Sequence, residues 1–117
     1  MAATELQAIV RFRFHAGDLE AFKRLSAQCM EIVRTRDTGT LQYDTYFNDD
    51  ETECIVIERF RDSEALIQHS ESLAHLMDAI IATGSVSGEL LGEPSAELRA
   101  RFTGGGPGQL FTPWMTM

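Results

Sequence analysis

The sequence predicts an α+β domain with the element order strand, helix, strand, strand, helix, strand. Two patterns support this class. Apolar residues recur at every second position at residues 6–14 and 40–48, as in half-buried strands, and at helical spacing in two longer segments. Right-handed connections between these elements give an antiparallel sheet that carries both helices on one face, with the first and third strands in its centre.

The length and charge of the chain limit its possible functions. Its 117 residues have the usual size of one domain around one hydrophobic core. Eighteen acidic and ten basic residues give a formal net charge of -8, which repels nucleic acids and anionic membranes, so we expect neither as a partner. The apolar runs are far shorter than the roughly 20 residues of a membrane span, and the first residues do not resemble a secretory leader. We therefore expect a cytoplasmic protein.

The first half of the domain consists of a strand at residues 6–14 and a helix that ends near residue 36. The strand places an apolar side chain at every second position, namely Leu6, Ala8, Val10, Phe12 and Phe14. In the helix, apolar residues recur at helical spacing, namely Leu19, Phe22, Leu25, Cys29, Ile32 and Val33. Asp18 precedes the helix, and Asp37-Thr38-Gly39 supplies the turn that follows it.

The second half begins with a predicted hairpin. Strands at residues 40–48 and 53–60 are joined by a polar turn. The segment Cys54-Ile55-Val56-Ile57 is apolar on both faces, which predicts a central strand that is covered on both sides. A second helix begins after Asp62 and carries an inward stripe from Leu66 to Ile81. A weaker strand follows at residues 86–92, where Gly88 interrupts the pattern.

Two helices can cover only one face of this sheet. In a monomer, isoleucine and arginine side chains of the other face would lie in water. Exposed patches of this kind usually mark an interface, so we expect a homodimer in which two sheets face each other and close a barrel.

We place the domain at residues 1–94 and a C-terminal extension at residues 95–117. Residues 95–102 have the spacing of a short helix, with Leu98 and Phe102 on one side. A glycine-rich stretch then leads to an apolar segment that includes Phe111 and Trp114. Because disordered tails are usually polar and charged, we expect these two aromatic residues to dock on their own subunit or on its partner.

His69 is the candidate residue for acid–base chemistry. Its spacing from Leu66 and Leu73 places it on the inward side of the second helix, whereas His75 falls on the outward side. An imidazole in apolar surroundings stays neutral near pH 7 and can accept a proton. The alternative is a core histidine that is hydrogen-bonded to a backbone carbonyl and has a structural role.

Other polar residues in the strands have structural explanations. Tyr43 and Tyr46 lie on opposite faces of one strand, so at most one of them shares a cavity with His69. Glu58 lies in a largely buried strand and needs a partner, and we expect an ion pair with Arg11 or Arg13 of the neighbouring strand. The two cysteines form no CxxC unit, and the motifs of phosphate, dinucleotide, zinc and serine-hydrolase sites do not occur, so we expect no metal.

Three segments between residues 39 and 72 carry a resemblance to a known family. They are Gly39-Thr40-Leu41-Gln42-Tyr43, Val56-Ile57-Glu58-Arg59-Phe60, and Ser63-Glu64-Ala65-Leu66 followed by His69 and Ser72. Together they resemble the antibiotic biosynthesis monooxygenase family. The resemblance implies a ferredoxin-like fold that pairs into a dimeric α/β barrel.

The resemblance also implies a function. Some members of the family oxidise phenols, anthrones or hydroquinones with molecular oxygen and without flavin or metal, because a deprotonated substrate of this kind can pass an electron to oxygen. The expected partners are therefore a small aromatic or hydrophobic molecule and molecular oxygen, with no cofactor. His69 matches the helix histidine of the family and is the expected catalytic residue, either as the base or as a donor that orients the substrate. The residues expected to bind the substrate are Tyr43, Glu58, Phe60 and Leu73.

Some features of the family are missing. Phe60 stands where the family often has tryptophan, and Ala74 stands where it often has a second histidine. The tryptophan of haem-degrading relatives has no match, so we expect no haem.

Two other classes of function are open at this point. The same fold could form a non-catalytic dimeric module that binds a small hydrophobic ligand, since a fold does not assign a function. RNA-binding domains share the topology and place aromatic residues on the first and third strands, as Phe12 and Phe14 do in part. The third strand lacks the basic-glycine-aromatic signature of such domains, and the negative charge opposes RNA binding.

Overall fold

The computed structural model describes residues 4–102 and 108–117. Its elements are β1 (Leu6–Phe14), α1 (Leu19–Arg36), β2 (Thr40–Phe47), β3 (Glu53–Phe60), α2 (Ser63–Ile81), β4 (Gly84–Leu91), α3 (Ala96–Phe102) and β5 (Gly108–Phe111). The predicted α+β class and the order of its six main elements are confirmed, and the short helix after residue 95 is present. The sequence pattern did not predict β5.

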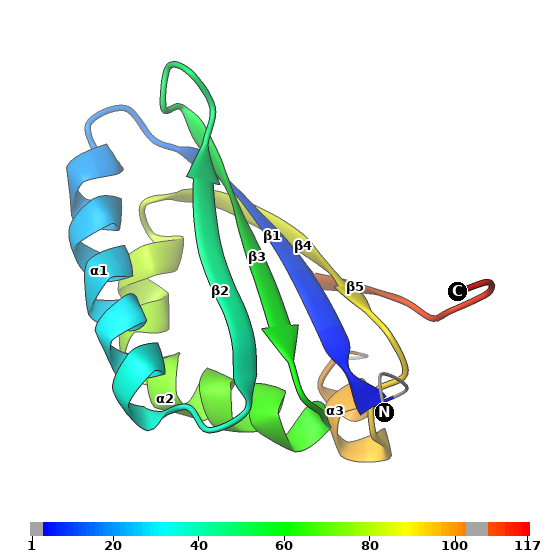
Figure 1. Ribbon diagram of the computed structural model, residues 1–117. Helices are drawn as coiled ribbons and strands as arrows, with labels where there is room; N and C mark the ends of the chain where they lie inside the picture. Colours follow the sequence, from blue (N-terminus) through cyan, green and yellow to red (C-terminus); the bar gives the residue numbers. More distant parts are fainter. Residues whose placement is uncertain (1–3, 103–107) are drawn as a thin grey trace.

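The strands form one sheet in the order β2-β3-β1-β4-β5, as Figure 1 shows for the path of the chain. The first four pair antiparallel, with β1 and β3 in the centre as predicted, whereas β5 runs parallel to β4. This βαββαβ arrangement is ferredoxin-like. The four residues of β5 are too few to show a strand period, and their pairing with the free edge of β4 is a tertiary contact.

Helices α1 and α2 lie side by side on one face of the sheet, which we call the inner face (Figure 1). Because side chains alternate along a strand, the even-numbered residues of β1 and β3 point toward the helices. Phe12, Cys54, Val56 and Phe60 are accordingly buried. Asp62 starts α2 by accepting a hydrogen bond from the backbone N–H of Ala65, as its position in the sequence predicted.

The core beneath the helices consists of two clusters of buried side chains. The larger cluster joins α1 to the middle of the sheet and comprises Phe12, Phe22, Cys29, Val33, Cys54, Val56, Leu73 and Ile80. The smaller one joins the start of α2 to α3 and comprises Leu6, Phe60, Ala65, Leu66, Ile67, Leu90 and Leu98. Both cysteines are free and buried.

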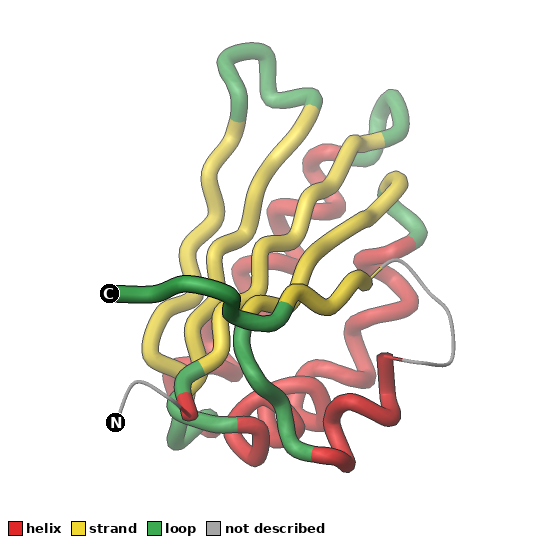
Figure 2. Tube along the Cα trace, turned by 90° about the vertical axis from the view of Figure 1, so that its right-hand side faces the viewer, coloured by secondary structure: helices red, strands yellow, loops and turns green. Residues whose placement is uncertain are grey.

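The other face, which we call the outer face, carries no helix in the single chain. Figure 2 looks onto this face and shows the segment after β5 crossing in front of the strands. Trp114 on this segment is 89% exposed and Phe111 is 46% exposed. Trp114 is therefore not docked on its own subunit, and its docking on a partner stays a prediction. None of the described helices is long and apolar enough to cross a membrane.

Candidate functional site

His69 lies where the helical spacing predicted, on the inner side of α2 facing the sheet. Its side chain is buried, whereas that of His75 on the outward side of the same helix is exposed. The aromatic rings of Tyr43 and Phe60 flank the imidazole, with centroids 5.3 Å and 5.0 Å from its own. These contacts limit rotation of the ring and so help to fix the direction of its nitrogen atoms.

A buried carboxylate orients His69. The Nδ1 atom of His69 lies 2.7 Å from Oδ2 of Asp37, and the Thr40 hydroxyl donates to the same oxygen at 2.7 Å. A carboxylate can only accept hydrogen bonds, so Nδ1 carries the proton and Nε2 carries the free lone pair. The other oxygen of Asp37, Oδ1, is buried and has no hydrogen-bond partner among the described residues.

Asp37 reaches His69 because the turn after α1 packs directly on α2. The amide and the hydroxyl of Thr38 both donate to the side-chain oxygen of Gln68, each at 3.1 Å. A Cβ atom at Gly39 would lie 2.5 Å from that of Ala65, so this close approach requires glycine. The sequence of residues 37–39 predicts only a turn, so Asp37 was not among the expected site residues. No pattern in the sequence shows that this turn lies beside His69.

Glu58 faces His69 from the sheet. Its Oε1 atom lies 3.6 Å from Nε2 of His69, and its side chain is 14% exposed. The expected ion pair with Arg11 or Arg13 is wrong, because Glu58 pairs in register with Ala8 on the inner face and these arginines point to the outer face. The arginines bind other carboxylates, Glu89 at 2.6 Å and Glu53 at 3.1 Å.

The surroundings of Glu58 and His69 change how readily each binds a proton. Burial, together with the nearby charge of Asp37, raises the pKa of Glu58 to about 8. Burial lowers the pKa of His69, and the hydrogen bond to Asp37 opposes this only in part. At pH 7 the carboxyl group of Glu58 is therefore mostly protonated and the imidazole is mostly neutral. An acid and a base, both uncharged, face each other across 3.6 Å.

Tyr43 completes the polar part of the site. Burial, with the neighbouring Cys29 and Glu58, raises the pKa of its phenol well above the usual value, so the hydroxyl keeps its proton. Tyr46 lies on the outer face and is 57% exposed, which confirms that the two tyrosines occupy opposite faces.

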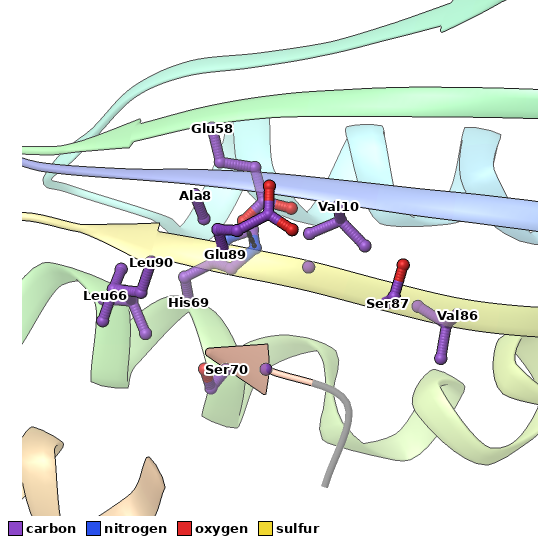
Figure 3. A pocket seen from close by; sticks show the side chains of 12 residues that line it. Ala8, Val10, Glu58, Leu66, His69, Ser70, Val86, Ser87, Glu89 and Leu90 are labelled. Atoms are coloured by element: carbon purple, nitrogen blue, oxygen red, sulfur yellow. Dashed lines mark ion pairs between the residues drawn. The ribbon is translucent and has the colours of Figure 1, made fainter. Parts of the chain in front are cut away.

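Two cavities meet at this site. The α1 cavity has a volume of about 270 Å³ and is lined by residues of α1, α2 and strands β1 to β4, including Tyr43, Glu58, His69 and Leu73. The β5 cavity has a volume of about 190 Å³ and lies between α2, β1, β4 and the start of β5 (Figure 3). Both are lined by Glu58 and His69.

The structure brings four of the five residues expected in the site to a cavity wall. Phe60 is the exception, because it is fully buried and packs behind the ring of His69 without lining either cavity. Within residues 4–102 and 108–117, no group of three or more histidine, cysteine or acidic side chains could hold a metal ion.

Comparison with known proteins identifies the fold and the family. A search of curated protein sequences finds no match. Among solved structures, MupZ from Pseudomonas fluorescens is 24% identical, with a TM-score of 0.77 over 97% of this chain and 93% of that one. Rv0793 from Mycobacterium tuberculosis is 21% identical, with a TM-score of 0.70 over 79% of this chain and 97% of that one.

A third similar structure is a mutant form of SnoaB, a cofactor-independent oxygenase from Streptomyces nogalater. It is 18% identical, with a TM-score of 0.67 over 80% of this chain and 97% of that one. The family model described as antibiotic biosynthesis monooxygenase matches residues 6–77, which include β1 to α2 and therefore Asp37, Glu58 and His69. The chain belongs to the antibiotic biosynthesis monooxygenase family.

Proposed function

We propose that this protein is a cofactor-independent monooxygenase that oxidises a small phenol, anthrone or hydroquinone with molecular oxygen. Membership of the family supports a monooxygenase-like role. The observation that carries the proposal is the buried group of Asp37, His69 and Glu58, which opens onto cavities with largely apolar walls. A substrate that reacts with oxygen after losing a proton needs a base, a dry site and a fixed orientation.

His69 is the proposed base. Its Nε2 atom faces the cavities with a free lone pair, because Asp37 holds the proton on Nδ1. The protonated carboxyl of Glu58 is placed to donate a hydrogen bond to the substrate oxygen as negative charge develops there, which stabilises the anion. Tyr43 and Leu73 line the α1 cavity and contact the aromatic ring, while Phe60 supports His69 from behind.

The oxidation of an anthrone illustrates the balance of the reaction. His69 takes a proton from the substrate, and the resulting anion forms a carbon–oxygen bond with O2. One oxygen atom remains in the product as a new carbonyl group. The other leaves as water, together with the two hydrogen atoms of the original CH2 group. The substrate itself supplies the electrons.

Oxygen uptake tests this proposal. We expect uptake with a panel of anthrones and hydroquinones, and a loss of about 10²- to 10⁴-fold in the His69→Ala variant because the base is removed. His75→Ala is the matched control, since His75 lies exposed on the same helix. Uptake no faster than that of His69→Ala for every compound would overturn the proposal.

A non-catalytic module for a small hydrophobic ligand is the second candidate. The apolar walls of both cavities favour it as much as they favour an enzyme. Tight binding of the same compounds to the wild-type protein and to His69→Ala, without turnover by either, is the result that this candidate predicts.

We also propose that the protein is a homodimer that buries the outer face. Tyr46, Ile55 and Phe111 on this face are 57%, 37% and 46% exposed in the single chain. The segment with Trp114, Met115 and Met117 projects from the same side. A second copy of the sheet would remove these apolar side chains from water.

A further inference from the structure

We infer that the substrate is an elongated molecule that lies across His69, with one apolar end in the α1 cavity and the other in the β5 cavity. Its chemical class is a phenol or anthrone that carries an apolar chain or a further ring. The inference rests on the proposed function, because it assumes that the reacting hydroxyl or carbonyl group lies at His69.

The residues of the strands show that the two cavities follow one another between the sheet and α2 and share part of their walls. Along β1, Ala8 lines only the β5 cavity, Val10 lines both, and Phe12 lines only the α1 cavity. Successive inward residues of a strand are about 7 Å apart. On β4, Val86 lies opposite Phe12 and lines both cavities, so the two overlap between the levels of Val10 and Phe12 and extend from there in opposite directions.

Helix α2, which faces β1 across the cavities, lines them in the same order along its length. Along α2, Leu66 lines only the β5 cavity and His69 and Ser70 line both. The residues of α2 that line only the α1 cavity are Leu73, Met77, Ile80 and Ile81. At 1.5 Å per residue, the lined part of α2 is about 22 Å long. The polar groups Glu58, His69 and Ser70 thus lie within this length, with apolar walls on either side.

The volumes favour joint occupancy by one ligand. Typical ligand sites measure roughly 300–1,000 Å³. The α1 cavity of about 270 Å³ and the β5 cavity of about 190 Å³ each fall below this range, whereas the two taken together fall within it. The exposed Ser70 borders both cavities, which gives one ligand an entrance at the edge of α2.

Half of the twelve residues that line the β5 cavity lie outside the part of the chain that the family model matches. That match ends at residue 77, whereas this wall includes residues 86–90 of β4 and Gly108 of β5 (Figure 3). The similarity to MupZ covers 97% of this chain and so extends into the C-terminal part, while that to Rv0793 covers 79%. We therefore assign the β5 cavity to substrate selection and the shared region to the reaction.

A series of hydroquinones with alkyl chains of increasing length tests the inference in two ways. Binding is measured in the absence of oxygen by calorimetry, and kcat/KM is measured by oxygen uptake. In the wild-type protein, affinity and kcat/KM should each rise about fourfold for every methylene group that enters the β5 cavity, until the cavity is full.

The Ala8→Leu variant fills the β5 cavity next to His69. It should remove this dependence on chain length, so that the preference for the longest over the shortest chain falls at least tenfold. Ala74→Leu adds the same volume at an exposed position of α2 that lines neither cavity, and it should keep the wild-type preference. If Ala8→Leu does not fold, Ala8→Val provides a smaller obstruction with a smaller loss of preference.

The outcomes separate the inference from the proposed function. Binding that depends on chain length, but without oxygen uptake, would support the elongated site and contradict the monooxygenase. Oxygen uptake in which neither affinity nor kcat/KM depends on chain length would overturn the elongated site and leave the monooxygenase function standing. A wild-type preference that survives in folded Ala8→Leu or Ala8→Val would also overturn it.

Discussion

The two faces of the sheet carry similar charged groups in opposite settings. On the outer face, Arg11 pairs with Glu89 at 2.6 Å and Arg13 pairs with Glu53 at 3.1 Å, and all four side chains are at least 27% exposed. On the inner face, Asp37 and Glu58 flank His69, and their side chains are 1% and 14% exposed. Each of these two outer carboxylates has an arginine, whereas the two inner carboxyl groups share one imidazole.

The difference supports the proposed role of Asp37, His69 and Glu58 in proton transfer. Outer ion pairs in contact with water contribute little to stability. Two buried carboxyl groups without an arginine or lysine cannot both ionise cheaply, so Glu58 holds its proton to a pKa of about 8. A buried group with such a shifted pKa beside a cavity is typical of a functional site.

After the removal of His69 itself, the largest expected effect comes from a substitution at Asp37, the carboxylate that orients it. An asparagine side chain can donate to Nδ1 of His69, which would move the imidazole proton to Nε2 and remove the base. We expect Asp37→Asn to lower kcat about 100-fold, or about 2.7 kcal/mol of transition-state stabilisation, with KM changed less than about threefold.

Two measurements separate this positioning role from a general loss of structure. Nitrogen-15 NMR of His69 should show the proton on Nδ1 in the wild-type protein and on Nε2 in Asp37→Asn. Thr40→Val removes only the second hydrogen bond to Asp37 and should keep the wild-type tautomer. An unchanged tautomer in Asp37→Asn would contradict the role assigned to Asp37.

A smaller effect concerns stability as a function of pH. The pKa of Glu58 is about 8 in the folded protein against 4.5 in the unfolded chain, so the folded state binds its proton more tightly. The resulting stabilisation is complete below pH 4.5 and is lost as the pH rises through 8. Between pH 6.5 and 8 we expect the free energy of unfolding to fall by about 1.5 kcal/mol.

Urea unfolding of the wild-type protein and of Glu58→Gln at several pH values measures this loss. The glutamine does not titrate, so the variant should lack most of the decline above pH 6.5. The lowered pKa of His69 acts in the opposite sense and only below about 6.5, because protonation there favours the unfolded chain. An equally steep decline in Glu58→Gln would assign the titration to another group.

The sequence was sufficient for the fold but only partly for the site. Period-2 and helical patterns are local, so they predicted six elements and the inward position of His69. The position of Asp37 beside His69 depends on how one turn packs against α2, and the partner of Glu58 depends on strand register. Both are relations between distant segments that no local pattern contains, and the pairing of β5 with β4 is a third.

The smallest expected effect on the single chain comes from the centre of the outer face. Ile55 is 37% exposed and lies opposite Arg11 in register, so Ile55→Glu adds a carboxylate next to an arginine. Within one protomer we expect the free energy of unfolding to change by less than about 0.5 kcal/mol. In the proposed dimer, the same carboxylate would be buried between two sheets and would prevent association.

Sedimentation velocity distinguishes the two situations. We expect the wild-type protein to sediment as a dimer and Ile55→Glu as a folded monomer, whereas Ala74→Glu, which adds the same charge on the exposed side of α2, should remain dimeric. A wild-type monomer, or a dimer that persists in Ile55→Glu, would show that the outer face meets water rather than a second sheet. The contrast between the faces would then be one between a solvated surface and a reactive interior, with no role for a partner.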